Sequence, residues 1–160
     1  MANRVAIITG AAQGIGAAIA ERFIREDYTA VLVDMDNDAG EMLTKKLGEN
    51  AHYFSCDISN SDEVKSLFSI VIEQFGKIDV LVNNAGIIKD NVIWKMPEED
   101  FDKVIDVNLK GTWIMCKRAG IQMREQKSGR KINITSRAWL GNRGQSNYAA
   151  SKAGVVGLTR

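Results

Sequence analysis

The chain has 160 residues, enough for one domain with a hydrophobic core. Its 21 basic and 20 acidic residues give a formal net charge of +1, so no field of one sign indicates binding to nucleic acid or to a membrane. No apolar run is long enough to span a bilayer, and residues 1–4 lack the pattern of a signal peptide. We therefore expect a cytoplasmic protein with reduced thiols at Cys56 and Cys116 and with no metal site.

Strands alternate with helices along the predicted chain. Short apolar runs predict strands at residues 5–9, 30–33, 52–56, 78–82 and 131–135. Helical spacing of apolar residues predicts helices at 15–26, 39–47, 64–75 and 110–124, with a further helix beginning at Pro97 and a last one running from near Tyr148 to Arg160. This order predicts an α/β fold of the Rossmann type, with a doubly wound parallel sheet, helices on both faces and one domain over residues 1–160.

A glycine-rich turn follows the first predicted strand. Gly10, Gly14 and Gly16 allow a tight turn and a close approach of the backbone to a pyrophosphate, and the helix that begins there favours negative charge. Gln13 and Ile15 lie within the same turn. Taken alone, these glycines also suit an ordinary connection between a strand and a helix.

Asp34 ends the second predicted strand, 18 residues after Gly16. A carboxylate at this point can accept hydrogen bonds from both ribose hydroxyls of an adenosine, and it would repel a 2′-phosphate. Residues 35–38, which begin with Met35, contain no cation that would receive such a phosphate. We therefore predict NAD(H) as the cofactor rather than NADP(H), although Asp34 could instead cap a turn or a helix.

Two later strand ends complete the predicted cofactor site. Asp57 follows the third strand, where its carboxylate could reach an adenine amino group or instead cap the next helix. Small residues at 83–86 let the backbone approach a cofactor, while the asparagines there can join neighbouring strands. The residues expected to bind the cofactor are Gly10, Gln13, Gly14, Ile15, Gly16, Asp34, Met35, Cys56, Asp57, Ile58, Asn84, Ala85 and Gly86, together with Tyr148 and Lys152.

Tyr148 and Lys152 are four residues apart on a predicted helix, so their side chains share one face. A cation one turn away favours the phenolate and makes the tyrosine usable as a proton donor and acceptor. Ser136 follows the fifth predicted strand, at the end of the sheet where ligands bind. A tyrosine and a lysine at this spacing also occur on ordinary helix surfaces, and Ser136 could merely end a strand.

These motifs, in this order, resemble the classical short-chain dehydrogenase/reductase family. The matching pieces are the turn at 9–16, residues 83–86, Asn108, Ser136, and Tyr148 with Lys152, and residues 141–148 are similar to the 3-oxoacyl-[acyl-carrier-protein] reductase-like branch. The resemblance implies an NAD(H)-dependent oxidoreductase that interconverts a carbonyl and a secondary alcohol. The physiological direction of the reaction and the identity of the small-molecule substrate stay open.

The resemblance also implies a role for each catalytic residue. Tyr148 would act as general acid and base toward the substrate oxygen, and Ser136 would hydrogen-bond that oxygen. Lys152 would hold the nicotinamide ribose, and Asn108 would interrupt its helix and order a water that links Lys152 to solvent. Eleven residues separate Ser136 from Tyr148, one fewer than is common in the family, and Thr135 would restore the common spacing. We favour Ser136 because a loop can lose one residue at small entropic cost.

Two further expectations concern the extent and the assembly of the molecule. Family members continue past this chain with two more strands and a substrate loop, so we expect a chain truncated after the fifth strand and the start of the following helix, with weak activity of its own. The alternative function is a catalytically silent NAD-binding or scaffold protein, or an inactive fragment. Residues 111–126 are apolar on more than one face, which indicates either a homo-oligomer, a dimer or tetramer, or a broad internal contact.

Overall fold

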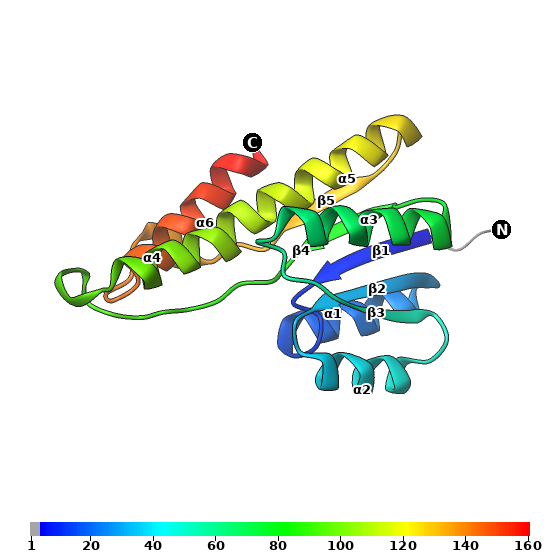
Figure 1. The fold of residues 1–160 in the computed structure, drawn as a ribbon, viewed down its shortest axis with the longest axis horizontal. Coiled ribbons are helices and arrows are strands. Elements are labelled where there is room, and N and C mark those ends of the chain that lie inside the picture. Colours follow the sequence, from blue (N-terminus) through cyan, green and yellow to red (C-terminus); the bar gives the residue numbers. More distant parts are fainter. Residues whose placement is uncertain (1–3) are drawn as a thin grey trace.

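The computed structural model describes residues 4–160 and has strands and helices in regular alternation (Figure 1). The strands are β1 (Arg4–Thr9), β2 (Tyr28–Asp34), β3 (Ala51–Ser55), β4 (Val80–Asn83) and β5 (Arg130–Asn133). The helices are α1 (Gly14–Arg25), α2 (Asn37–Leu47), α3 (Ser61–Phe75), α4 (Glu98–Ile105), α5 (Thr112–Gln126) and α6 (Ser146–Thr159), with short helical turns at Ile93–Lys95 and Arg137–Leu140. Each of these helices is too short or too polar to cross a membrane.

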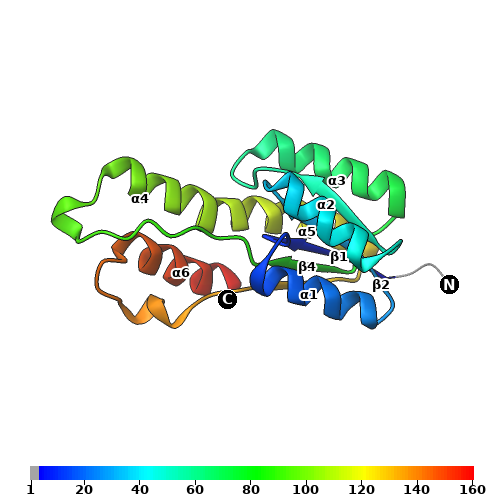
Figure 2. The same ribbon diagram turned by 90° about the horizontal axis from the view of Figure 1, so that it is seen from below.

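All five strands form one parallel sheet in the order β3-β2-β1-β4-β5. The helices α1 and α3 lie on opposite sides of the strands (Figure 2). This arrangement confirms the predicted Rossmann-type fold. Because β2 pairs with one edge of β1 and β4 with the other, the chain reverses its direction of winding at β1, and a crevice opens between the carboxyl ends of β1 and β4.

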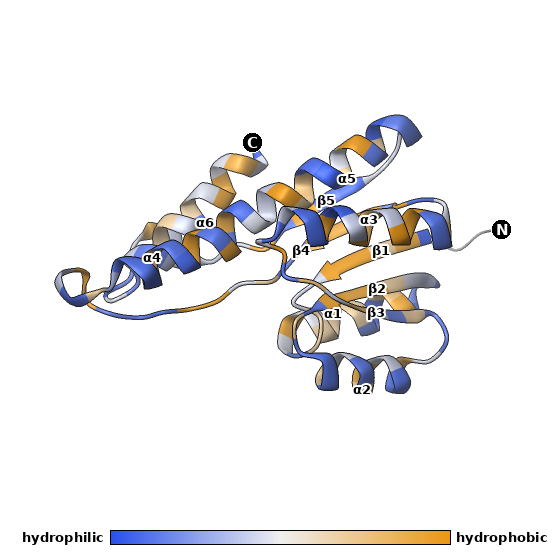
Figure 3. Cartoon of the chain, viewed as in Figure 1, coloured by the Kyte–Doolittle hydropathy of each residue, from blue (hydrophilic) through white to orange (hydrophobic). Residues whose placement is uncertain are grey.

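The strands β1, β2 and β4 are mostly apolar and buried because both faces of the sheet are covered there, as Figure 3 shows for β1 and β2. Side chains of a strand point alternately to the two faces, so Val5 and Ile7 pack in one buried cluster while Ala6 and Ile8 pack in the other. The first cluster includes residues of α3 and α5, and the second includes Ala20 of α1. The two layers hold the carboxyl ends of the strands at one edge, where the site lies.

A π-helical segment joins α4 to α5 at Asp106–Gly111. The sequence predicted two separate helices here, one beginning at Pro97 and one over residues 110–124, whereas the structure has a continuous helical run from Glu98 to Gln126. The spacing of apolar residues changes phase across the π-helical turn, because that turn inserts one extra residue into the helix. Because of this change of phase, the spacing of apolar residues in the sequence did not predict one continuous helix.

The strand β5 lies at the edge of the sheet. Within residues 4–160 it pairs with β4 alone, and Arg130, Lys131 and Ile132 are exposed, with 45% of the Ile132 surface accessible. The strand ends at Asn133, two residues before the predicted end. The backbone leaves the sheet there and turns toward the start of α6.

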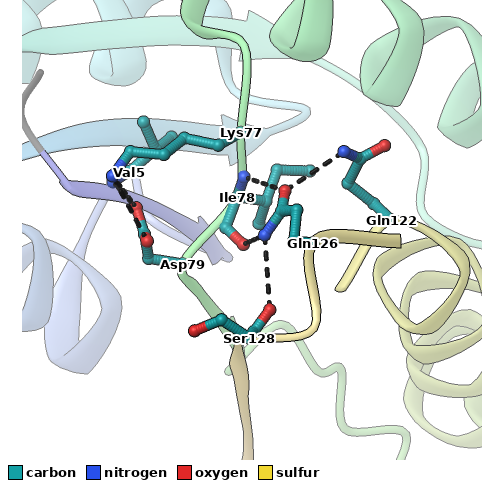
Figure 4. Close-up of polar contacts among 7 residues, drawn as sticks. All are labelled: Val5, Lys77, Ile78, Asp79, Gln122, Gln126 and Ser128. Atoms are coloured by element: carbon teal, nitrogen blue, oxygen red, sulfur yellow. Dashed lines mark hydrogen bonds and ion pairs between the residues drawn. The ribbon is translucent and has the colours of Figure 1, made fainter. Parts of the chain in front are cut away.

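Just before β4, the Gln126 side chain at the end of α5 hydrogen-bonds to the backbone of Ile78 (Figure 4). Its Oε1 accepts a hydrogen bond from the Ile78 backbone N–H at 2.9 Å, and its Nε2 donates to the Ile78 carbonyl at 2.9 Å and to the Ser128 carbonyl at 3.3 Å. Nearby, Asp79 accepts from the Val5 backbone N–H at 2.7 Å and pairs with the Lys77 ammonium at 3.2 Å. These contacts fix the start of β4 against α5 and β1.

We expect Gln126→Met to lower the free energy of unfolding by about 1–3 kcal/mol, because two backbone groups beside the core lose their partners while the side chain keeps its length. Urea denaturation followed by circular dichroism measures the change. Gln74→Met is the matched control, since Gln74 is exposed on α3. Equal midpoints for the two variants would show that the amide of Gln126 contributes nothing.

Candidate active site

A cavity of about 430 Å³ opens at the carboxyl ends of β1 to β4. Its position, at the reversal of strand order, is the usual ligand site of open parallel sheets. The sequence predicted ten of its lining residues as cofactor-binding residues: Gly10, Gln13, Asp34, Met35, Cys56, Asp57, Ile58, Asn84, Ala85 and Gly86. Its other lining residues are Val33, Ile87, Lys103 and Val107. Residues far apart in sequence therefore meet here because parallel strands end at the same edge.

The glycine turn brings the backbone of β1 close to the segment after β4. Gly10 has φ of +63°, and a Cβ there would lie 2.8 Å from the Cα of Ala85. A Cβ on Gly16 would collide with the Gly10 carbonyl oxygen. The N-cap residue Gln13 makes no side-chain hydrogen bond to the first turn of α1, which leaves backbone N–H groups at this helix start available to an anion. Gly14, Ile15 and Gly16 belong to this turn but do not line the cavity.

Thr9 and Asn84 fasten this turn to the end of β4. The Thr9 hydroxyl oxygen accepts hydrogen bonds from the backbone N–H groups of Asn84 and Ala85, each at 3.0 Å. The Asn84 amide donates to the carbonyls of Thr9 and Gly10, also at 3.0 Å. The buried Asn83 joins the next pair of strands, because its amide donates to Asn133 Oδ1 at 2.8 Å. The asparagines at 83–84 thus hold three strands together at the cavity.

Asp34 organises the backbone around its own strand end. Its Oδ2 accepts from the Ala12 N–H at 3.0 Å, and its Oδ1 accepts from the N–H groups of Met35 and Asp36 at 2.8 and 3.2 Å. The cap of α2 is Asp36, whose carboxylate accepts from the Ala39 N–H. Asp34 is therefore a turn-stabilising acid at the cavity wall, and its remaining lone pairs can still accept from hydroxyl groups.

Asp57 and Cys56 line the cavity beyond Asp34. The Asp57 Oδ1 accepts from the backbone N–H and the hydroxyl of Ser59 at 2.9 and 2.7 Å. Burial opposes the charge of Asp57, yet the Ser59 hydrogen bonds and the Lys103 ammonium outweigh it, so the Asp57 pKa lies below its ordinary value. Asn60, not Asp57, caps α3.

Burial, with the charges of Glu63 and Asp57, raises the pKa of the Cys56 thiol to about 12. This thiol is therefore protonated and unreactive.

Tyr148 and Lys152 lie one turn apart on α6, with the Lys152 Nζ 5.6 Å from the centre of the Tyr148 ring. Lys152 is only 4% exposed, and its ammonium donates to the Ile134 carbonyl at 3.0 Å. Burial lowers the pKa of Lys152. The ammonium is therefore desolvated and fixed in direction, with donor capacity left for a further oxygen.

Asn108 lies in the π-helical segment and is fully buried. Its Oδ1 accepts from the Ile87 N–H at 2.8 Å, and its Nδ2 donates to the Ile87 carbonyl at 3.0 Å and to the Ser151 hydroxyl at 3.2 Å. A Cβ on Gly86 would lie 3.3 Å from Asn108 Oδ1 and 3.6 Å from the Lys152 Nζ. Asn108 and Lys152 thus both adjoin the cavity wall at Gly86, although neither lines the cavity itself.

The two candidate hydroxyl donors have different surroundings. The Thr135 hydroxyl donates to the Lys152 backbone carbonyl on α6 at 3.0 Å, so the Thr135 hydroxyl hydrogen is already used in a bond within the protein. The Ser136 oxygen accepts from the Ala138 N–H at 3.2 Å, which leaves the Ser136 proton free to be donated. This difference favours Ser136 as a donor to a bound oxygen atom.

Sequence reasoning did not single out Asn147, which is fully buried beside Tyr148. Its Oδ1 accepts from the Tyr148 N–H at 2.7 Å, and its Nδ2 donates to the carbonyls of Lys89 and Asp100 at 2.9 and 3.4 Å. The side chain therefore ties the first turn of α6 to the segment after β4 and to α4. In the sequence, the structural role of Asn147 is indicated only by its position directly before Tyr148 at the start of a predicted helix.

The parallel sheet, the glycine-rich turn and the cavity at the strand reversal together define a Rossmann-type α/β fold. Residues 4–160 match the model of the family described as short chain dehydrogenase, and the chain belongs to that family. This confirms the resemblance stated above and assigns the chain to a family of oxidoreductases.

Several relatives match the chain over most of its length. It is 43% identical to a 3-oxoacyl-[acyl-carrier-protein] reductase FabG of Staphylococcus epidermidis, with 99% of this chain and 67% of the relative covered. It is 42% identical to the (2S)-[(R)-hydroxy(phenyl)methyl]succinyl-CoA dehydrogenase subunit BbsD of Thauera aromatica, with 99% and 65% covered. It is 46% identical to an uncharacterized oxidoreductase of Mycobacterium bovis, with 93% and 62% covered. The chain spans about two thirds of the length of these relatives.

Proposed function

We propose that the protein is an NAD(H)-dependent oxidoreductase that interconverts a carbonyl and a secondary alcohol. The observation that carries this proposal is the buried Lys152 ammonium beside the Tyr148 ring. Neither side chain lines the cavity, but the ammonium lies behind its wall at Gly86. A phenol next to a desolvated cation is suited to proton transfer, which must accompany hydride transfer to or from a carbonyl carbon.

In the proposed reaction, the nicotinamide ring supplies or accepts the hydride. Tyr148 donates a proton to the carbonyl oxygen during reduction and takes it back during oxidation. Lys152 favours the phenolate electrostatically and uses its remaining N–H donors on ribose hydroxyls, while Ser136 hydrogen-bonds the substrate oxygen. Asn108 fixes the Ile87 backbone and Ser151, which keeps the wall at Gly86 and the middle of α6 in place.

The cavity supports NAD(H) as the proposed cofactor. Asp34 brings a carboxylate to the end of β2, and the neighbouring Met35, Asp36, Asn37 and Asp38 offer no cation for a 2′-phosphate. Met35 is an exposed apolar side chain on the cavity wall, which suits a contact with a flat aromatic base. Gly10, Gln13 and the free N–H groups at the start of α1 would face the pyrophosphate.

For the substrate, we propose a 3-oxoacyl group or a closely related carbonyl compound. The names of the relatives from Staphylococcus epidermidis and Thauera aromatica both contain an acyl group carried on a larger molecule, an acyl-carrier protein in one and coenzyme A in the other. The activity is proposed for the whole protein, since those relatives are longer than this chain. No observation favours a catalytically silent binding protein.

We also propose a homo-oligomer, formed through α4 and α5. The inner face of α5 packs in the core through Ile114, Met115, Ala119 and Met123, which accounts for part of its apolar character. Its outer face still exposes Trp113 and Ile121 by 48% and 50%, and Phe101 of α4 is 40% exposed. A single α-helix with two apolar faces needs a second partner. Light scattering of the whole protein measures the assembly.

We expect Tyr148→Phe to reduce kcat for NADH-dependent ketone reduction by at least about 10²-fold, because the proton donor is lost. The Kd for NADH should change by less than about 2-fold, since the phenylalanine keeps the ring. Absorbance at the NADH band measures turnover, and a fluorescence titration measures binding. Turnover within a few-fold of the native rate would contradict the role of Tyr148.

The hydroxyl donor is tested with Ser136→Ala and Thr135→Val. We expect the serine change to lower kcat/KM by about 10²-fold and the threonine change to lower mainly the stability of α6, because only the Ser136 proton is free. Both rates and both unfolding midpoints are measured. The assignment is wrong if only the threonine variant loses activity.

Cofactor preference is measured as kcat/KM for NADH against NADPH. We expect NADH to be favoured by at least about 10-fold in the native protein, because the Asp34 carboxylate repels a 2′-phosphate. Asp34→Ser should bring the kcat/KM for NADPH closer to the kcat/KM for NADH, because the repelling carboxylate is removed. Comparable kcat/KM values for the two cofactors in the native protein would contradict the proposed preference.

A further inference from the structure

Tyr53 is a residue of β3, where it pairs with Leu32 of the neighbouring strand β2. Its hydroxyl donates a hydrogen bond to the backbone carbonyl of Asp34 at 2.9 Å and lies 3.0 Å from Asn37 Oδ1. Asp34 is the last residue of β2, and Asn37 is the first residue of α2. One phenol therefore contacts both ends of the turn that leads from the strand to the helix.

The Tyr53 ring is held against α2, which lies alongside β3 (Figure 1). Its neighbour on the helix is the buried Gly40, where a Cβ would collide with the ring. Glycine inside a helix costs about 1 kcal/mol relative to alanine, and here the glycine makes room for the ring. The contact leaves the phenol little space to move, so the direction of its hydroxyl toward the turn is fixed.

The direction of the Asp34 carboxylate depends on the same turn. Two of the backbone N–H groups from which the carboxylate accepts belong to Met35 and Asp36, inside the turn. Another belongs to Ala12, in the glycine-rich turn after β1. A shift of the backbone between β2 and α2 would therefore move the carboxylate at the cavity wall, although Tyr53 itself does not line the cavity.

We propose that Tyr53 is a positioning residue that sharpens the choice between NADH and NADPH, because it holds the Asp34 carboxylate in the direction of the adenosine ribose. The inference rests on the proposed function, since it assumes that the cavity binds a dinucleotide with this ribose at Asp34. A carboxylate held in one direction accepts hydrogen bonds from the ribose hydroxyls and opposes a 2′-phosphate with its full charge. A carboxylate on a loose turn loses part of the first interaction and can rotate away from the phosphate.

The test measures the Kd of the whole protein for NADH and for NADPH by fluorescence titration. Tyr53→Phe removes the hydroxyl and keeps the ring, so we expect NADH binding to weaken by about 5-fold while NADPH binding stays equal or becomes stronger. The preference for NADH then falls by at least about 5-fold. Tyr28→Phe is the matched control, because Tyr28 lies at the start of β2, outside the cavity, and should leave the preference unchanged.

A second variant displaces the ring without removing the hydroxyl. Gly40→Ala places a methyl group where the ring lies, so the preference for NADH should fall as it does in Tyr53→Phe. An unchanged preference in either variant, even with a lower unfolding midpoint, would show that Tyr53 only supports the fold and would overturn the inference while leaving the proposed function intact. If the native protein binds the two cofactors equally, the inference and the proposed cofactor preference both fail.

Discussion

The junction between β1 and β4 is the constraint on which the rest of the site depends. Parallel pairing brings the two strand ends together, and the hydrogen bonds between Thr9 and Asn84 close the junction. Gly10 and Gly16 then allow a backbone separation that any side chain would prevent. The cavity exists because this contact fixes both of its walls.

A second organising feature is the removal of the Lys152 ammonium from water. Burying a cation is unfavourable unless fixed dipoles replace its hydration. The Ile134 carbonyl supplies one such dipole, and Asn108, through Ser151, and Asn147 hold the helix that carries the lysine. The π-helical turn also helps to hold α6 in place, because it positions Asn108 so that its amide hydrogen-bonds to both Ile87 and Ser151 of α6.

The sequence predicted the fold and most of the cavity wall, because both follow from local rules. Apolar runs predicted the strands, and residues at the ends of parallel strands must meet, which placed Asp34, Asp57 and Asn84 together. Lys103 and Asn147 could not be found in this way. Each gains its surroundings from packing between distant segments, and a lysine or an asparagine on a helix carries no local mark of that packing. The catalytic roles of Tyr148 and Ser136 stay predictions.

The strand β5 has a physical consequence of its own. One of its sides is hydrogen-bonded to β4, and its other side presents backbone N–H and C=O groups that no neighbouring strand takes up within residues 4–160. The two basic residues of β5, Arg130 and Lys131, discourage a second copy from adding itself there through charge repulsion. An extended segment without positive charge is not repelled by Arg130 and Lys131, so the free edge of β5 is the place where a further strand can be added to the sheet.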